Sequence, residues 1–348
     1  MIPIAADSFA GFSTMLTGYR QFYLMAEVVR SGIVDAVEAG SDTAAALAAC
    51  LNLQPDETGR FVDLLCAIGL LEQSDDRLRL SPFSQRFLSG ASAENQRNTL
   101  LFEPILIDNW RRLGTILQQG QGALTQPQPQ EAYHKRLELF QASMAEAASV
   151  RSAELWQALA PLLPPQGTIM DIGAGEGVYL RAFLQRYPDW QGIACDLPDV
   201  CARIMRQDLT GKLAVLPCNI LDQQEFGACT AAHCGTAGLV LLSNLLHCYG
   251  PQENRAVLEQ AAGMLAPDGL LVVHDFFRDA NLYGALYDLH MLVNTWNGRC
   301  YSSADTSALL QEVGLGHTRV IELPSHSWAV LASRSQAALH RDALRNSH

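Results

Sequence analysis

A short glycine-rich segment is the first part of the chain whose residue types and spacing indicate chemistry. It reads DIGAGEG over residues 171–177 and stands between a strand-like run, TIMDI, and a helix-like run, VYLRAFLQRY. Glycines at such a turn allow a sharp bend and let the backbone approach a ligand, beside the partly positive amino end of the following helix. The segment therefore predicts a small-ligand site between a strand and a helix.

The spacing of the glycines distinguishes between two classes of nucleotide-like ligand. A dinucleotide-binding loop would read G-x-G-x-x-G and would need glycine at position 178, where this chain has Val178. The pattern D-x-G-x-G-x-G is instead typical of S-adenosylmethionine binding. The segment therefore favours S-adenosylmethionine over a dinucleotide, with Asp171, Gly173, Gly175 and Gly177 as the residues of the motif.

Two further side chains follow the next strand-like runs and suit a nucleoside. Asp196 ends the run GIACD, where a carboxylate can accept hydrogen bonds from both ribose hydroxyls. Asn219 follows the run LAVLP, where its side-chain oxygen could accept from an adenine amino group. Each residue also has an ordinary structural explanation, Asp196 as a helix cap before Pro198 and Asn219 as a turn residue.

A histidine and an aspartate follow the fourth and fifth strand-like runs. Ligands of parallel sheets lie at the carboxyl ends of the strands, so His247, just after GLVLL, is placed to reach a bound substrate. Neutral imidazole can accept a proton, and Asp275 at the end of LLVVHD could hold one ring nitrogen and leave the other free. The alternatives are a core or helix-capping histidine and a strand-end turn aspartate.

Metal binding is the competing interpretation of the histidines and cysteines. The candidates are Cys229, His233, Cys234, His274 and His290, but their spacing matches neither the paired motifs of structural zinc sites nor the three ligands of catalytic ones. We therefore predict no metal site. The nine cysteines are odd in number and stand mostly in apolar stretches, which favours reduced, mostly buried thiols over disulfides.

The elements that must position these residues form an α/β pattern. After Gly167, strand-like and helix-like runs alternate, which predicts a doubly wound, mostly parallel sheet. Residues 1–100 instead read as helices followed by a short hairpin, in which Thr43 and Asp56 are expected to cap helices and Gly69 to end one. A helix-turn-helix followed by a hairpin is typical of a winged helix.

The remaining boundaries come from prolines and composition. Residues 101–163 read as helical, with an exposed loop at 122–130, and the prolines at 164 and 165 close this region. We expect a winged-helix domain at 1–100, a helical connector at 101–163, a cofactor-binding domain at 164–334 and a tail at 335–348.

Charge and hydropathy exclude several classes of protein. The net charge is −12, and residues 1–100 carry seven Arg, no Lys and twelve Asp or Glu, so a nucleic-acid partner is not expected. The second helix of the predicted winged helix offers Arg60 alone to phosphates, which favours packing against protein. Long apolar runs and a basic signal-like start are missing, so we expect a cytoplasmic protein without a membrane partner.

With these motifs, nearly the whole chain resembles the class I S-adenosylmethionine-dependent O-methyltransferases of the plant caffeic-acid and bacterial natural-product type. The resemblance rests on DIGAGEG, on the run Asp196-Leu197-Pro198, on LLSNLLHCYGPQEN and on LAPDGLLVVHDF. It implies a Rossmann-like methyltransferase domain, a homodimer formed through the winged-helix domain, and methyl transfer to a hydroxyl of a small aromatic or polycyclic metabolite.

The resemblance also implies roles for single residues. Asp196 and Leu197 would lie at the ribose, Ile220 against the adenine, and Ser243 near the amino-acid end of the cofactor. His247 would be the general base and Asp275 its orienting acid. The positions that line the substrate in such enzymes are taken here by Phe140, Met144, His290, Met291 and Trp296.

This chain departs from the family pattern at two places. Asn219 stands where the relatives have an acidic residue, and residues 298–302 read GRCYS where many carry a second glutamate that contacts the histidine. Other outcomes therefore stay open. The acceptor could be nitrogen or carbon, the reaction could be a decarboxylation or hydroxylation on the same fold, or the protein could be a non-catalytic regulator.

Overall fold

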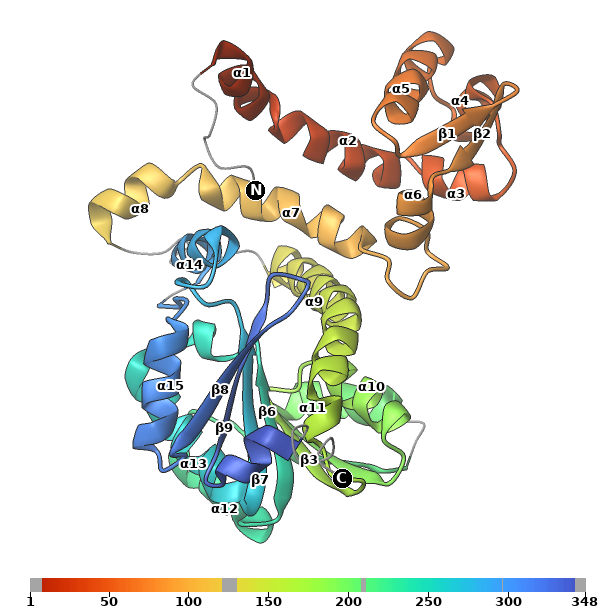
Figure 1. The fold of residues 1–348 in the computed structure, drawn as a ribbon. Helices are drawn as coiled ribbons and strands as arrows, with labels where there is room; N and C mark the ends of the chain where they lie inside the picture. Colours follow the sequence, from red (N-terminus) through yellow and green to blue (C-terminus); the bar gives the residue numbers. More distant parts are fainter. Residues whose placement is uncertain (1–7, 121–129, 208–210, 296, 342–348) are drawn as a thin grey trace. The chain divides into compact units, whose positions relative to one another are not determined.

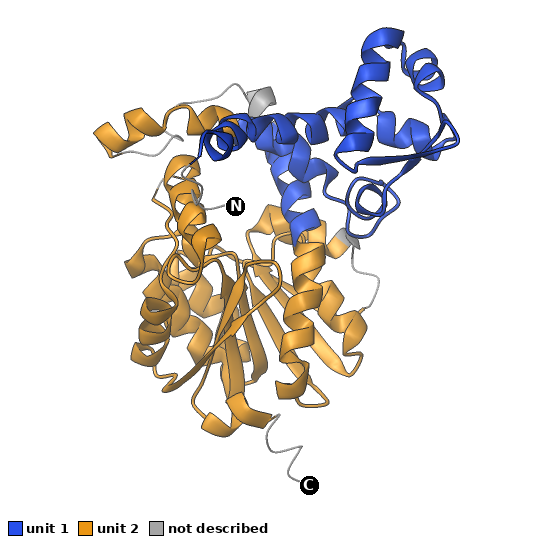
Figure 2. Ribbon diagram, turned by 45° about the horizontal axis from the view of Figure 1, so that its top comes forward, with its two compact units in different colours: residues 1–106, 129–147 blue, residues 107–128, 148–348 orange. Residues whose placement is uncertain are grey.

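The computed structural model describes residues 8–120, 130–207, 211–295 and 297–341. The chain divides into two compact units, one of residues 1–106 and 129–147 and the other of residues 107–128 and 148–348 (Figure 2). The division passes through helices α7 (Arg97–Trp110) and α9 (Gln130–Leu159), so the expected connector of residues 101–163 is shared between the units.

The first unit begins with a helical region that ends in a two-stranded hairpin (Figure 1). Its elements are α1 (Phe9–Thr17), α2 (Tyr19–Arg30), α3 (Ile33–Glu38), α4 (Ala44–Leu51), α5 (Pro55–Ala67), β1 (Leu71–Ser74), β2 (Arg77–Leu80) and α6 (Pro82–Phe87). The order α4, α5, β1, β2 is the helix-turn-helix and hairpin that the sequence predicted.

The predicted turn and cap residues of this unit have mixed outcomes. Thr43 caps α4, because its hydroxyl accepts a hydrogen bond from the Ala46 N–H at 3.1 Å. The Asp56 cap is wrong. Gln54 is the N-cap of α5 and Pro55 is its first residue, a position that suits the fixed φ of proline and its missing N–H. The hairpin turn lies at residues 75–76.

The core of the first unit is built by apolar residues of its helices and of its hairpin. It includes Val28, Ile33, Leu47, Leu65 and Leu78. Some apolar side chains of α5 and of its carboxyl end are only partly buried. Leu64 and Ile68 are 42% and 40% exposed and leave apolar surface on that helix.

The second unit is built on a seven-stranded sheet with the order β5-β4-β3-β6-β7-β9-β8 (Figure 1). Its strands are β3 (Gly167–Ile172), β4 (Trp190–Asp196), β5 (Leu213–Pro217), β6 (Ala237–Ser243), β7 (Leu265–Asp275), β8 (His317–Glu322) and β9 (Trp328–Ser333). The first five are parallel, whereas β9 pairs antiparallel with both β7 and β8. The sequence analysis did not predict β8 and β9.

Helices cover both faces of this sheet because its central strands are apolar on both sides. Leu239 and Leu241 of β6 face one core and Val240 and Leu242 the other. The first core includes residues of α9 and α10 (Val178–Arg186) and of the short helix η5 (Gln336–His340). The second includes residues of α12 (Gln223–Thr230), α13 (Pro251–Met264) and α15 (Ser303–Glu312).

The other helices of this unit are α8 (Leu113–Gln119), α11 (Pro198–Gln207) and α14 (Leu282–Asn294). The tail expected from residue 335 begins with η5, whose Ala338 and Leu339 are buried. The nine cysteines are unpaired, as expected, but only four are buried: Cys195, Cys201, Cys218 and Cys300. No helix within the described ranges is long and apolar enough to cross a membrane.

Candidate active site at the carboxyl ends of the strands

Five residues expected at the site come from five adjacent parallel strands. Asp171 lies in β3, Asp196 ends β4, Asn219 follows β5, Ser243 ends β6 and Asp275 ends β7. The spatial order β5-β4-β3-β6-β7 places these strand ends at one edge of the sheet. The strand order reverses between β3 and β6. Doubly wound sheets bind their ligands beside such a reversal, at the carboxyl ends of the strands.

The glycine loop has the backbone conformation that its sequence requires. Gly173, Gly175 and Gly177 have φ values of 73°, 56° and 70°, which side chains other than glycine rarely tolerate. A β carbon at Gly173 would lie 2.7 Å from the Leu245 side chain, whereas nothing lies within 4 Å of one at Gly175. The loop is therefore packed against the protein on one side and open on the other.

The carboxylate of Asp196 holds this loop. Its Oδ2 accepts a hydrogen bond from the Gly175 N–H at 2.8 Å, and its Oδ1 accepts from the Leu197 N–H at 2.7 Å. Burial raises the pKa of Asp196 against the opposing effect of these two N–H groups. The glycine loop and Asp196 are thus in direct contact. Leu197 is 51% exposed.

Asn219 forms a local turn. Its Oδ1 accepts from the Leu221 N–H at 3.1 Å, and its own N–H donates to the Glu225 carboxylate at 3.0 Å. The side-chain oxygen considered for adenine recognition is therefore already used by the turn. Ile220, expected against the adenine, is 7% exposed and belongs to a core cluster.

Among the described residues, three buried oxygens beside the loop lack a hydrogen bond of good geometry. They are Oδ2 of Asp171, the hydroxyl of Tyr179 and Oδ1 of Asn244. Burial, together with the Asp196 charge, raises the pKa of Asp171 to about 8, and burial raises that of Tyr179 to about 12. Unpaired buried polar groups are costly, so these atoms fit a ligand that brings hydrogen-bond donors and positive charge.

S-adenosylmethionine meets that requirement, because it carries an ammonium group, ribose hydroxyls and a sulfonium charge. The open side of Gly175 and the unpaired oxygens therefore fit this cofactor. The sequence analysis missed Tyr179, although it lies only two residues after the last glycine of the loop. Tyr179 lies in a helix with apolar periodicity, where a tyrosine at that position also fits the hydrophobic core.

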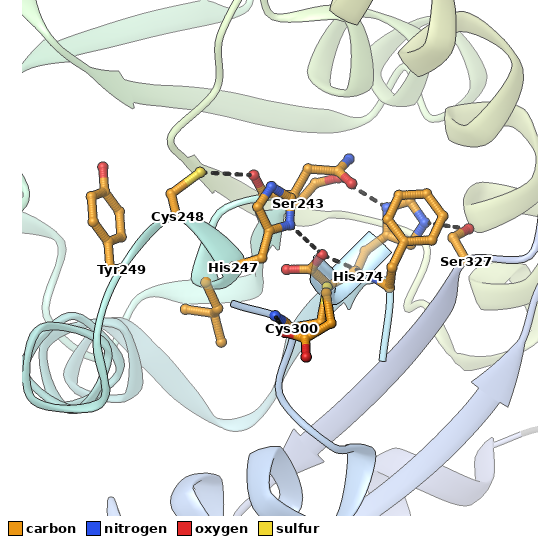
Figure 3. Close-up of polar contacts among 12 residues, drawn as sticks. Ser243, His247, Cys248, Tyr249, His274, Cys300 and Ser327 are labelled. Carbon is orange, nitrogen blue, oxygen red and sulfur yellow. Dashed lines mark hydrogen bonds and ion pairs between the residues drawn. The ribbon is translucent and has the colours of Figure 1, made fainter. Parts of the chain in front are cut away.

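His247 and Asp275 form a buried pair (Figure 3). Nδ1 of His247 lies 2.5 Å from Oδ1 of Asp275, and the residues are 6% and 3% exposed. Burial disfavours the imidazolium, but the Asp275 carboxylate outweighs it and raises the pKa of His247 to about 10. Because Nδ1 faces the carboxylate, Nε2 is the nitrogen left to face a substrate, with the Cys248 side chain close to the ring.

The segment of residues 298–302, where relatives carry a second glutamate, contacts the backbone of His247. The Arg299 N–H donates to the His247 carbonyl at 2.9 Å, and a β carbon at Gly298 would lie 2.6 Å from that oxygen. Cys300 is 1% exposed near the pair (Figure 3), and burial, aided by the Asp275 charge, raises the pKa of its thiol. Among the described residues, Asp275 is the carboxylate paired with His247.

A second buried histidine supports Ser243. Nδ1 of His274 lies 2.9 Å from the Ser243 hydroxyl and Nε2 lies 2.9 Å from the hydroxyl of Ser327, just before β9 (Figure 3). Burial, with a contribution from Arg151, lowers the pKa of His274 to about 3, so the ring is neutral. Sequence reasoning considered this histidine only as a metal candidate and missed its position.

An aromatic wall stands beside the His247 ring. Tyr287 of α14 lies 5.5 Å from His247 and 4.4 Å from Phe276, measured between ring centroids. His290, one turn further along α14, stacks on Tyr287 at 5.3 Å. Met291 is 6% exposed in the cluster with Phe276, so it packs inward.

Two of the other substrate-lining candidates belong to the first unit, and the third is not described by the structure. Phe140 and Met144 belong to the first unit, where they are 42% and 39% exposed and Phe140 packs against Phe102. Trp296 lies outside the described residues. Tyr287 and Trp110 were missed, because only the folded chain brings them to the histidines.

Comparison with known proteins decides the family. The profile of a family described as O-methyltransferase domain matches residues 120–316. The chain belongs to this family. The protein is an S-adenosylmethionine-dependent O-methyltransferase of small metabolites, as the sequence predicted.

Two curated relatives of this methyltransferase come from Streptomyces species. It is 24% identical to a 3-hydroxy-5-methyl-1-naphthoate 3-O-methyltransferase of Streptomyces sahachiroi, over 89% of this chain and 90% of the relative. It is 27% identical to an O-demethylpuromycin-O-methyltransferase of Streptomyces alboniger, over 88% of this chain and 84% of the relative.

The fold of the methyltransferase is confirmed by a solved structure. Human N-acetylserotonin methyltransferase in complex with S-adenosylmethionine matches with a TM-score of 0.80 and 19% identity, over 97% of this chain and 100% of that chain. The predicted Rossmann-like domain behind a helical region is therefore correct, and the cofactor is S-adenosylmethionine.

Proposed function

We propose that the enzyme methylates a hydroxyl group of a small aromatic metabolite, with His247 as the general base. The observation that carries this proposal is the buried pair of His247 and Asp275, which leaves Nε2 of a ring flanked by Tyr287 pointing away from the carboxylate. A flat aromatic acceptor suits this wall. The named substrate of the Streptomyces sahachiroi relative, a hydroxynaphthoate, is of the same class.

The chemistry requires orientation and the removal of one proton. Bound S-adenosylmethionine supplies a methyl group that is already activated. Fixed alignment of the acceptor oxygen can lower the barrier by about 7–11 kcal/mol. A phenol with a pKa near 10 is mostly neutral at pH 7, so a positioned base adds roughly 10²- to 10⁴-fold. His247 accepts the hydroxyl proton at Nε2, and the Asp275 carboxylate stabilises the resulting imidazolium.

The cofactor-binding residues follow from the strand ends. We assign the ribose hydroxyls to Asp196, whose two oxygens each have lone pairs beyond the single N–H they accept. The unpaired oxygens of Asp171, Tyr179 and Asn244, together with Ser243, suit the donors of the amino-acid end. Ile220 remains the residue assigned to the adenine face.

Replacement of His247 tests the base. In His247→Ala we expect the affinity for S-adenosylhomocysteine, measured by calorimetry, to stay within about threefold, while transfer of labelled methyl to a phenolic panel falls by roughly 10²- to 10⁴-fold. His317→Ala, at an exposed position of β8, is the matched control and should change neither. Unchanged turnover in His247→Ala would reject the base role.

We also propose that the enzyme is a homodimer through its first unit. Apolar side chains project from α1 and the start of α2, with exposed fractions between 51% and 82% at Phe9, Phe12, Met15, Leu16 and Tyr19. Monomeric proteins rarely leave such a continuous apolar surface in water. A second copy of the same helices supplies a complementary apolar surface.

A further inference from the structure

The hydrogen bonds of His290 determine which of its ring nitrogens carries the proton. Nδ1 of His290 lies 3.4 Å from the indole nitrogen of Trp110 and 3.3 Å from the amide nitrogen of Asn294. An indole N–H can only donate. The amide of Asn294 has one consistent orientation, because its nitrogen also donates to the His290 carbonyl at 3.0 Å and its oxygen accepts from Asn109 at 2.8 Å.

Two donors therefore approach one ring nitrogen, and that nitrogen must be the acceptor. The neutral ring then carries its proton on Nε2. A second proton on Nδ1 would face both donors. Burial, together with the positive charge of His247, lowers the pKa of His290 to about 4, which agrees with the neutral state at physiological pH.

The Nε2–H of His290 has no partner in the described part of the chain. The ring stacks on Tyr287 with 22° between the planes, and Tyr287 in turn meets His247 edge to face at 73°. The side chain of His290 is only partly buried. A donor of fixed tautomer thus stands one aromatic ring away from His247 and is unused by the residues that the structure describes.

We propose that His290 determines specificity by donating the Nε2 hydrogen to a carbonyl or carboxylate oxygen of the methyl acceptor. This proposal rests on the proposed function for the identity of the acceptor as a phenol. Because the ring cannot accept a hydrogen bond at Nδ1, a substituent that only donates gains nothing there. The enzyme should therefore prefer phenols with an sp² oxygen substituent over alkyl phenols of equal shape.

Matched ligands test the preference without turnover. The probes are the three hydroxyacetophenones and the three ethylphenols, titrated by calorimetry into the enzyme saturated with S-adenosylhomocysteine. We expect at least one acetyl compound to bind about three- to tenfold more tightly than its ethyl counterpart, the range of one net hydrogen bond.

Two variants assign that difference to His290. His290→Phe keeps a ring for stacking on Tyr287 but removes the donor, and the preference should disappear. His290→Gln places an amide N–H near the original Nε2 and should restore part of it. Equal preference in wild type and His290→Phe, no preference in wild type, or no binding of any probe would overturn the proposal.

Nuclear magnetic resonance tests the tautomer separately. Long-range ¹H–¹⁵N spectra should show His290 as a neutral ring protonated at Nε2 near pH 7, and Trp110→Phe should weaken this preference. A ring protonated at Nδ1, or a charged ring, would contradict the proposal. If no phenol is methylated while the spectra and the binding preference hold, the proposed function fails and the His290 assignment stands.

Discussion

Three histidines in one region of this enzyme differ in charge because their partners differ. His247 faces a carboxylate, which raises its pKa to about 10. His274 lies between two hydroxyl groups and His290 accepts from an indole and an amide, and burial lowers their pKa values to about 3 and about 4. One residue type thus supplies a charged ring paired with a carboxylate and two neutral hydrogen-bonding rings.

The high pKa of His247 predicts a dependence on cofactor charge. Without ligand, the ring holds a proton at pH 7 and cannot act as a base. A nearby positive charge disfavours the imidazolium, so its pKa should be lower with S-adenosylmethionine than with S-adenosylhomocysteine, which lacks the sulfonium charge. Titration of the His247 ring nitrogens by NMR in the two complexes checks this. Identical pKa values in both would contradict it.

Burial of Asp171 is expected to lower the stability of the ligand-free enzyme, although the same carboxylate is needed to bind the cofactor. Its folded-state pKa of about 8 exceeds the usual 3.8, so its contribution to stability is present below about pH 4 and is lost as the pH rises through 8. In ligand-free Asp171→Asn, we expect a melting temperature above that of the wild type, by an amount that increases from pH 5 to pH 9, and at least tenfold weaker cofactor binding.

The measurement is thermal unfolding at several pH values, with and without S-adenosylhomocysteine. The exposed Asp189→Asn is the matched control and should not change the pH dependence. A melting-temperature difference between wild type and Asp171→Asn that does not vary with pH would show that burial of Asp171 has no such cost.

At this scale the sequence predicted which residues stand at the ends of strands. The positions of Asp196, His247 and Asp275 could be predicted because parallel strands place their carboxyl ends together. His274 and Tyr179 were missed, since each also fits the apolar pattern of a strand or helix. The tautomer of His290 depends on Trp110, 180 residues earlier in the chain, and periodicity carries no information on such a pair.

Helix α14 carries the aromatic wall, and one glycine sets how closely it packs. A β carbon at Gly284 would lie 1.9 Å from the Phe277 carbonyl oxygen, while Asn281 caps the helix by accepting from the Gly284 N–H at 2.8 Å. The start of α14 therefore has no space for a side chain at this position. The placement of Tyr287 and His290 follows from that contact.

We expect Gly284→Ala to destabilise the enzyme by roughly 1–3 kcal/mol, as overpacking does, and to raise the KM for the acceptor more than that for the cofactor. Gly263→Ala, near the end of α13 with nothing within 4 Å, is the control and should be neutral or stabilising by up to about 1 kcal/mol. Urea unfolding and steady-state kinetics measure both. Equal stability of the two variants would refute the packing argument.

Element prediction succeeded where the pattern was local and failed where pairing was distant. The five parallel strands and the β1–β2 hairpin each have a clear period and turn residues. Strands β8 and β9 were missed because β8 is half exposed and shows no strong alternation, and its partner is defined only by the sheet. The Asp56 cap failed because a proline one residue earlier fits the first helical position better.

At the scale of the whole molecule, the apolar face of α1 predicts association of two chains. The double variant Phe12→Glu/Leu16→Glu should halve the mass measured by light scattering, because two charges replace apolar contacts on each copy. Val320→Glu, a single exposed apolar position on β8, is the control and should leave the mass unchanged. A wild-type mass of one chain, or a double variant of unchanged mass, would contradict the dimer.

The position of β9 between β7 and β8 has a consequence for biosynthesis. The edge of β7 stays unpaired until residues 328–333 have left the ribosome, well after the glycine loop and all five parallel strands have emerged. An open strand edge invites pairing with other chains. Chaperone binding during translation should therefore begin with the exposure of β7 and end when β9 is inserted.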